Sequence, residues 1–223
     1  MRLCVFNGSP RGKNSNTRLL LDHFIKGYLT VCESDFSMLY LRETDKDTEF
    51  VNAFRESEYV ILAFPLYTDA MPAIVKRFIE LLEPFKGRND NPAMGFIIQS
   101  GFPESSQSRY LERYLIKLTH RLNAEYIGTV IRGGAEGIQM QPPSWTKKLF
   151  KSFYTLGISF ANSDRFDPVI VKSLAGREKE SSIHLFFKKF FADKGLSNFY
   201  WNYQLKKNKA MHMRDHQPFL KGN

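Results

Sequence analysis

A polar stretch near the start of the chain limits the possible folds more strongly than anything that follows it. Residues 6–17 read FNGSPRGKNSNT. The apolar residues 3–6 before this stretch are typical of a buried strand, and the apolar positions of residues 18–25 after it suit a helix. A polar turn between a strand and a helix directs free backbone N–H groups and the positive end of the helix dipole at an anion.

The side chains of the same stretch match that role. The hydroxyls of Ser9, Ser15 and Thr17 can donate to phosphate oxygens, and the guanidinium of Arg11 can grip two of them at once. We therefore predict a phosphate site here. A helix N-cap in a polar loop is the plainer alternative, because Ser, Asn and Thr are favoured at caps.

Two well-known phosphate loops do not fit this stretch. The dinucleotide fingerprint G-x-G-x-x-G fails at Gly8-Ser9-Pro10, and the nucleotide-triphosphate loop fails because Asn14 follows Lys13 where Ser or Thr is required. What remains resembles the G-S-P-R…S-N-T loop of flavodoxin-like NAD(P)H-dependent FMN reductases. The resemblance implies a cradle for the terminal phosphate of FMN made by Ser9, Arg11, Ser15, Asn16 and Thr17.

Two later loops strengthen the resemblance. Residues 65–72, PLYTDAMP, look like the P-L-Y…M-P segment that lies against the isoalloxazine ring in that family. The implied ring contacts are Pro65, Leu66, Tyr67 and Thr68. A shorter match at residues 100–104 implies contacts from Ser100, Gly101 and Phe102. The glycine-rich residues 133–137 fit equally a wall of the site, a contribution to a partner subunit, or a plain loop.

Apolar segments alternate with amphipathic ones along most of the chain, as expected for a parallel α/β sheet. We expect strands at residues 3–6, 36–41, 59–64, 93–99 and 125–131, with Pro65 ending the third. Helices are expected near residues 18–25, 47–57, 74–82, 110–118 and 145–160. The predicted fold is a flavodoxin-like, doubly wound, five-stranded parallel sheet. Its ligands would bind beyond the carboxyl ends of the strands, at the switch point.

The pattern changes at about residue 163, so we predict an FMN-binding domain at 1–162 and a basic, aromatic-rich helical extension at 163–223. Residues 1–143 carry 17 Lys and Arg against 17 Asp and Glu, whereas residues 144–223 carry 15 against 6, so the net charge of +9 lies entirely in the second part. Apolar stripes at residues 183–191 and 199–205 suit core packing, a dimer contact or a membrane surface.

Other features restrict the class of protein. The chain starts directly with the first strand and has no signal peptide or run of about 20 apolar residues, so we expect a cytoplasmic protein. Two cysteines, 28 positions apart, are too few for an ordinary iron–sulfur cluster. His212 and His216 lack a third obvious ligand, and we predict no metal site.

The resemblance implies an FMN-dependent oxidoreductase that transfers hydride from NADPH or NADH to a quinone, nitroaromatic, azo compound or similar small acceptor. It needs no catalytic side chain, because the cofactor carries the chemistry. A homodimer is expected, and no nucleic-acid partner. Two alternatives stay open. One is a flavodoxin-type electron carrier without direct nicotinamide oxidation, and the other is a flavin-free protein whose basic end binds nucleic acid or membrane.

Overall fold

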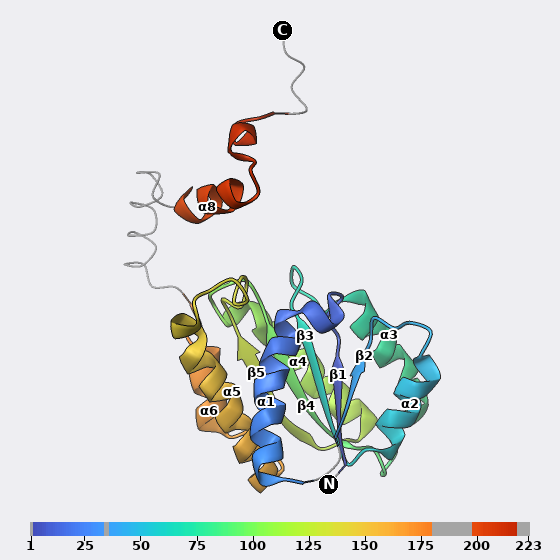
Figure 1. The fold of residues 1–223 in the computed structure, drawn as a ribbon. Coiled ribbons are helices and arrows are strands. Elements are labelled where there is room, and N and C mark those ends of the chain that lie inside the picture. Colours follow the sequence, from blue (N-terminus) through green and yellow to red (C-terminus); the bar gives the residue numbers. More distant parts are fainter. Residues whose placement is uncertain (1, 34–35, 180–197, 218–223) are drawn as a thin grey trace. The chain divides into compact units, whose positions relative to one another are not determined.

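The structure is a computed structural model that describes residues 2–33, 36–179 and 198–217 (Figure 1). The chain divides into two compact units, Met1–Lys179 and Glu180–Asn223. The sequence placed the division at 162/163. All of the elements that surround the predicted site belong to the first unit.

Five parallel strands form the sheet of the first unit, in the order β2-β1-β3-β4-β5. All five expected strands are present, and their ends differ from the expected ones by one residue at most. Their bounds are β1 Leu3–Asn7, β2 Phe36–Tyr40, β3 Tyr59–Pro65, β4 Ala93–Gln99 and β5 Tyr126–Arg132.

The third strand includes Pro65, one residue more than the sequence suggested. Pro65 pairs with Gln99 of β4. On the other side of β3 the neighbouring strand β1 has already ended opposite Ala63. The missing N–H of the proline therefore leaves no ladder hydrogen bond unmade.

Helices cover both faces of the sheet, which confirms the predicted doubly wound fold (Figure 1). One face is covered by α1 Asn16–Val31, α5 Pro143–Ser163 and α6 Pro168–Ala175. The other is covered by α2 Asp47–Glu56, α3 Ala73–Leu81 and α4 Ser106–Leu122. Short 3₁₀ helices lie at Gly12–Asn14 and Glu83–Phe85.

Alternation along each strand divides the core into two apolar layers. In β1, Leu3 and Val5 face α1 and α5, while Cys4 and Phe6 face the other helices. All four are fully buried, and burial of each larger side chain contributes roughly 1.5–3 kcal/mol. The layer that contains Cys4 and Phe6 is rich in phenylalanine, and the ring centroids of Phe6 and Phe78 lie 4.4 Å apart.

Helices α1 and α5 approach each other at backbone distance. A Cβ atom on Gly27 would overlap the carbonyl oxygen of Tyr154, and one on Gly157 would overlap that of Phe24. Two glycines on facing helices therefore permit a crossing that any side chain would push apart. Helices α1 and α5 form the most extensive helix–helix contact among the described elements.

The segment after α5 packs onto the sheet as well. Phe166 and Leu174 are buried in the layer that contains α1 and α5. Asp167 caps α6, because its Oδ1 accepts from the N–H groups of Val169 and Ile170 at 2.7 and 3.2 Å. An Asp-Pro pair is a helix-start signal, and the sequence interpretation did not use it.

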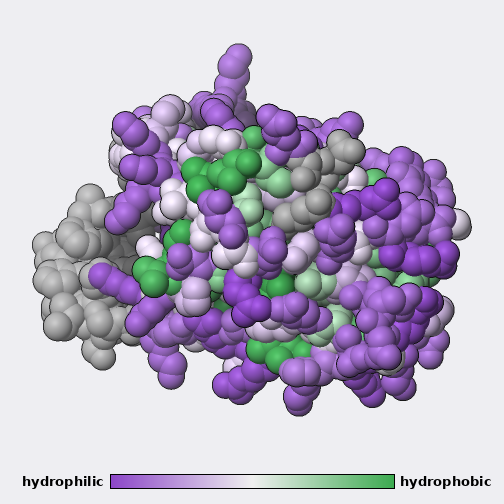
Figure 2. All heavy atoms as spheres, turned by 90° about the horizontal axis from the view of Figure 1, so that it is seen from below, coloured by the Kyte–Doolittle hydropathy of each residue, from purple (hydrophilic) through white to green (hydrophobic). Residues whose placement is uncertain are grey.

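The second unit contains α8 Phe199–Lys207, as expected from residues 199–205, and a 3₁₀ helix at Met211–Met213. The expected helix at 183–191 lies outside the described residues. Across the described ranges, no helix has both the length and the apolar character needed to span a membrane. Seen toward the amino ends of the strands, the surface is mostly hydrophilic, with small separate apolar patches (Figure 2).

Candidate functional site

The strand order creates a crevice at the carboxyl ends of the strands. The neighbouring strands β1 and β3 are followed by helices on opposite faces of the sheet, α1 on one face and α3 on the other, so the chain turns to opposite sides after these two strands. Ligands of open parallel sheets bind at such a reversal, beyond the carboxyl ends of the strands. The loops after β1, β3, β4 and β5 border a cleft of about 310 Å³, lined by Ser9, Arg11, Asn16, Pro65, Leu66, Tyr67, Thr68, Gln99, Ser100, Gly101 and Glu136.

Internal hydrogen bonds fix the loop after β1. The Oδ1 of Asn7 accepts from the N–H of Ser9 at 2.9 Å, and the carbonyl of Ser9 accepts from the N–H of Gly12 at 2.9 Å. Gly12 has a φ of +57°, which glycine adopts without strain. Ser15 caps α1: its Oγ accepts from the N–H of Arg18 at 3.0 Å and donates to the carbonyl of Gly12 at 2.6 Å. The loop is thus held in shape by its own residues.

The same loop leaves donors available at the start of α1. The backbone N–H groups of Asn16 and Thr17 donate to no residue in the described ranges, as expected in the first turn of a helix. Arg11 is exposed and lines the cleft, and within those ranges its guanidinium forms no ion pair or hydrogen bond. Two fixed N–H groups beside a free cation suit an anion such as phosphate.

The loop after β3 folds back at its tip. Tyr67 and Ala70 bridge each other through N–H to oxygen distances of 2.9 and 3.2 Å. Between them Thr68 has a φ of +54°, a conformation that β-branched residues rarely adopt. The base of the loop is anchored, because the N–H of Leu66 donates to the carbonyl of Gln99 at 2.7 Å. The N–H of Thr68 donates to no described residue and is available at the cleft.

The loops after β4 and β5 hold each other. The N–H of Gly134 donates to the carbonyl of Phe102 at 2.7 Å, and the N–H of Ala135 donates to that of Ser100 at 2.8 Å. A Cβ on Gly133 would lie 2.6 Å from the Phe102 oxygen, so glycine permits this close approach. The residues 133–137, which the sequence left open, thus form a wall beside the cleft.

Asn16 connects this wall to the first loop. Its buried Nδ2 donates to the carbonyl of Ala135 at 2.7 Å, and its Oδ1 accepts from Nε2 of Gln139 at 2.9 Å. The Nε2 of Gln139 is also 3.3 Å from the carbonyl oxygen of Asn14. The side chain of Asn16 therefore positions the wall, and only its backbone N–H is left to face a ligand.

Nine of the twelve residues proposed from the sequence line the cleft, and three do not. Ser15 is occupied as the helix cap. Thr17 is fully buried, and its Oγ1 accepts from Nε2 of Gln99 at 3.4 Å. Phe102 contributes its carbonyl to Gly134, while its ring is 43% exposed. The binding role of all twelve stays a prediction.

The sequence interpretation missed two lining residues. Gln99 is buried at the end of β4. A polar residue that closes an apolar strand at the ligand edge was the available signal. Glu136 is the one carboxylate among the residues that line the cleft. Its position depends on the contact between two distant loops, which no local pattern specifies.

A further cation lies at this edge of the sheet. Arg132 ends β5 and pairs with Gln99. Its Nε is buried with no hydrogen-bond partner in the described part of the chain, and burial lowers the pKa of its guanidinium. Among those residues, no group of three His, Cys, Asp or Glu side chains could hold a metal ion.

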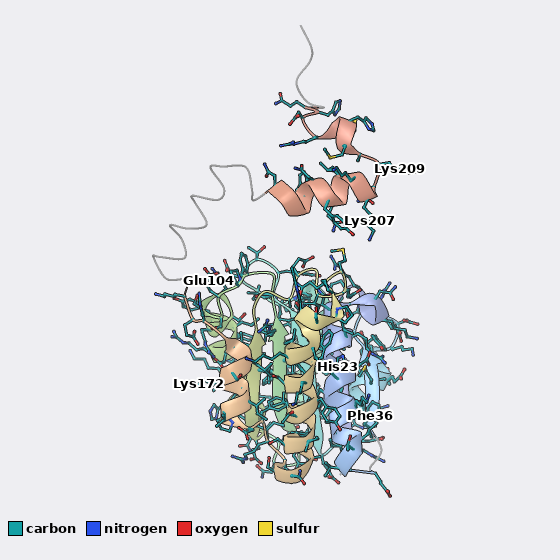
Figure 3. All side chains as sticks on the ribbon, turned by 60° about the vertical axis from the view of Figure 1, so that its left-hand side comes forward. His23, Phe36, Glu104, Lys172, Lys207 and Lys209 are labelled. Carbon is teal, nitrogen blue, oxygen red and sulfur yellow. The ribbon has the colours of Figure 1, made fainter. Side chains whose placement is uncertain are left out.

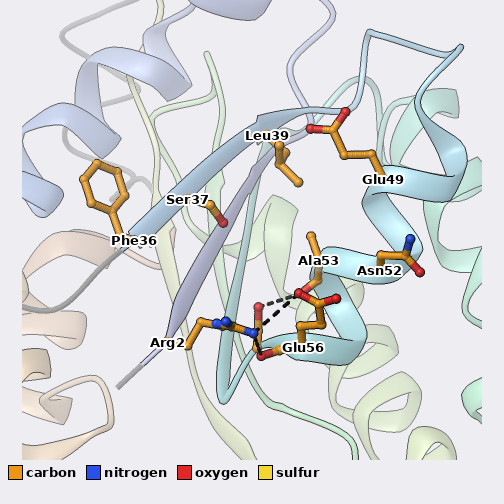
Figure 4. Close-up of a pocket in the computed structure, with 9 residues that line it drawn as sticks. Arg2, Phe36, Ser37, Leu39, Glu49, Asn52, Ala53 and Glu56 are labelled. Atoms are coloured by element: carbon orange, nitrogen blue, oxygen red, sulfur yellow. Dashed lines mark hydrogen bonds and ion pairs between the residues drawn. The ribbon is translucent and has the colours of Figure 1, made fainter.

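A different cavity, of about 650 Å³, lies beside β2 and α2 (Figure 4). There Nη1 of Arg2 donates to the carbonyl of Glu56 at 3.0 Å, and it lies 3.4 Å from the carboxylate of the same residue. This cavity contains none of the residues singled out by motif. The cleft at the carboxyl edge is therefore the candidate site.

Comparison with known families decides the classification. A family described as having a flavodoxin-like fold matches residues 1–148. The chain belongs to this flavodoxin-like family. This match confirms the flavodoxin-like part of the resemblance inferred from the sequence. No curated protein sequence matches the chain.

Solved structures share this flavodoxin-like fold at low sequence identity. An FMN-dependent NADH-azoreductase from Bacillus anthracis, in complex with FMN, is 14% identical with a TM-score of 0.57, over 72% of this chain and 99% of that one. An apo NADH:FMN oxidoreductase is 16% identical with a TM-score of 0.56, over 81% and 96%. An NAD(P)H:quinone oxidoreductase from Methanothermobacter marburgensis is 12% identical with a TM-score of 0.55, over 72% and 96%.

The flavodoxin-like cleft presents two chemical regions. The end near Arg11 offers backbone N–H donors and a cation. The end between Tyr67 and Gly101 is formed by loop backbone, and the N–H groups of Thr68 and Gly101 donate to no described residue. The geometry therefore suits a ligand with an anionic tail and a flat, polar-edged head.

Proposed function

We propose that this protein is an FMN-dependent oxidoreductase that takes hydride from NADPH or NADH and passes electrons to a small acceptor such as a quinone, an azo compound or a nitroaromatic. The observation that carries the proposal is the cleft itself. It combines a helix N-terminus, a free guanidinium and unpaired backbone donors from two further loops. Solved proteins of the same fold named as FMN-dependent NADH-azoreductase and NAD(P)H:quinone oxidoreductase support it.

The residues present fit FMN. Arg11, the Ser9 hydroxyl and the N–H groups at the start of α1 would hold its terminal phosphate. Residues 66–68 and 100–101 would lie along the ring, with the N–H groups of Thr68 and Gly101 as donors to its polar edge. The cleft volume of about 310 Å³ is at the lower end of the range for small-molecule sites, roughly 300–1,000 Å³, and the cleft is open on one side.

FMN, when bound, supplies the hydride acceptor and donor, so the chain's contribution is binding, orientation and electrostatics. The loop after β1 orients the phosphate because its own hydrogen bonds fix it. Backbone donors near Thr68 and Gly101 favour negative charge at the ring edge, since fixed dipoles need no reorganisation. Tyr67 is 47% exposed and is available to cover a ring or an incoming substrate.

The test is an absorbance spectrum of the purified protein, with added FMN if necessary, followed by anaerobic addition of NADPH and then of a quinone. We expect flavin bands that bleach with NADPH and return with the quinone. Flavin that binds but is not reduced by NADPH or NADH would favour an electron carrier instead. Failure to bind FMN would overturn the proposal.

A further inference from the structure

A second large cavity lies outside the cleft, in a groove between α1 and α5. Its volume is about 930 Å³. The two helices touch at Gly27 and Gly157, and the groove opens toward their amino ends, where residues 138–144 join it. Apolar atoms of Leu19 and Ile138 contribute to its lining. His23 lies on α1 (Figure 3), and its ring stacks on that of Phe150 of α5, with the two ring centroids 4.2 Å apart.

The charge of this groove is of one sign. Lys26, Lys147 and Lys151 line it, and none of its lining residues is an Asp or a Glu. Within the described ranges these three lysines form no ion pair. Lys148, which is on α5 together with Lys147 and Lys151, adds a fourth exposed cation. A largely apolar groove whose charged residues are all cations complements a partner that is both anionic and apolar.

Two large exposed side chains lie at the start of α5 and in the loop before it. Trp145, in the first turn of α5, is 74% exposed, and Met140 in the preceding loop is 54% exposed. Each is next in the sequence to a residue that lines the groove, Gln141 or Ser144, and Trp145 is three residues before Lys148, which makes these two neighbours on the exposed surface of α5. An exposed indole next to lysines is typical of proteins that bind at a lipid–water interface, where the ring has an apolar body and a polar N–H.

We propose that this face, formed by Lys26, Met140, Trp145, Lys147, Lys148 and Lys151, docks on an anionic lipid bilayer. The lysines approach the headgroups, and Trp145 and Met140 enter the interfacial layer. A second copy of the chain would present the same basic groove, so two copies that met through this face would repel each other.

The docking face borders the cleft. Gln139 lines the groove, and its Nε2 bonds to Asn16, which lines the cleft. A protein held on a bilayer by this face would keep one wall of its cleft near the lipid. For the proposed reductase, this position gives access to lipid-soluble acceptors. The docking face itself does not depend on that function.

The chain offers a built-in reporter, because it contains only two tryptophans, Trp145 and Trp201. In the full-length Trp201→Phe variant, Trp145 is the single source of indole fluorescence. We expect its emission maximum to shift to the blue when phosphatidylglycerol vesicles are added, and to stay unchanged with phosphatidylcholine vesicles. High salt should reverse the shift, because the headgroup attraction is screened.

A charge-reversal variant and a matched control complete the test. Lys147→Glu, Lys148→Glu and Lys151→Glu together should weaken binding to phosphatidylglycerol vesicles, measured by flotation, by at least about 100-fold. Lys86→Glu, Lys117→Glu and Lys172→Glu make the same charge change on other surfaces and should have far less effect. Circular dichroism checks that both variants fold.

Several results would overturn the proposal. One is an unchanged Trp145 spectrum with phosphatidylglycerol vesicles. Another is an equal loss of binding in the control variant. A third is an equal blue shift with heparin or DNA, which would identify a general polyanion surface. A fourth is vesicle binding that shifts Trp201 in a Trp145→Phe variant while Trp145 stays unaffected, which would assign lipid binding to the second unit.

Discussion

The loops after β1 and β3 face the same cleft but are stabilised in different ways. The first is closed by side-chain and backbone hydrogen bonds through Asn7, Ser9, Gly12 and Ser15, and its one left-handed residue is a glycine. The second is held by a two-residue bridge around Thr68, which adopts a positive φ without being glycine. The first loop is partly buried and has no strained residue, whereas the second is exposed and contains one.

This difference suggests a division of work between the loops. A phosphate needs fixed donors at fixed places, and a loop that is hydrogen-bonded internally provides them before the ligand arrives. A ring that exchanges substrates needs a boundary that can adjust, and strained conformations concentrate at such places. The four predictions below test this division, in order of the size of the expected effect.

The largest effect is expected from removing the phosphate donors. The double variant Arg11→Ala and Ser9→Ala should weaken FMN binding by at least about 100-fold, because a charge-assisted hydrogen bond and a hydroxyl at the cleft are lost together. Fluorescence titration with FMN measures it. Lys13→Ala is the control, since Lys13 is exposed and does not line the cleft. If both variants bind FMN with equal affinity, the assignment of the loop after β1 to the FMN phosphate is wrong.

The second effect concerns the contact between the first loop and α3. A Cβ on Gly8 would overlap Cγ2 of Val75. Gly8→Ala should therefore lower the free energy of unfolding by about 1–3 kcal/mol. Gly101→Ala is the comparison, because its Cβ would lie at an ordinary 3.4 Å from Glu136. Urea denaturation of the two variants measures the difference, and similar stabilities would mean that the Gly8 approach is looser than described.

The third effect distinguishes a residue that stabilises the first loop, Ser15, from one that is proposed to contact the ligand, Ser9. Ser15→Ala removes the cap of α1 and should destabilise the protein by about 1 kcal/mol. Ser9→Ala removes a hydroxyl that bonds to no described residue, so it should leave stability within about 0.5 kcal/mol and weaken FMN binding alone. If the thermal midpoint falls more for Ser9→Ala than for Ser15→Ala, the roles are reversed.

The smallest effect is expected in the second loop. Thr68→Gly should stabilise the fold by up to about 1 kcal/mol, since relief of a left-handed threonine exceeds the entropic cost of the glycine. Asp69→Gly, next to it and without a positive φ, should instead be neutral or destabilising. Thermal unfolding of the pair gives the sign. A loss of stability in Thr68→Gly would show that the turn is not strained.

Most of this fold could be predicted from the sequence because its strands are short, apolar and bounded by turn residues. Helix α6 was missed because its signal, Asp167 followed by Pro168, lies in a region assigned to the extension by composition. In the site, Thr68 and Gly101 were proposed from motif resemblance, and their place at the cleft follows from the order of strands and loops.

Other parts of the site depend on long-range contacts. Asn16 was predicted to bind the cofactor, and its side chain instead binds Ala135, which lies 119 residues away in the chain. Glu136 enters the cleft only because Gly134 bonds to Phe102. No local periodicity or motif specifies which distant loops will meet, so these assignments required the structure.

The position of β1 in the sheet has a consequence for how the protein is made. The first of these five strands to leave the ribosome is β1, and it must be enclosed by β2 and by β3, which begins with Tyr59. At roughly 5–20 residues per second, its apolar residues wait several seconds for that partner. Parallel pairing over such sequence separations is slow, so the nascent chain exposes Leu3–Asn7 to chaperones and to other chains before the sheet can close. Early translation is thus the period in which this protein is most open to misassembly.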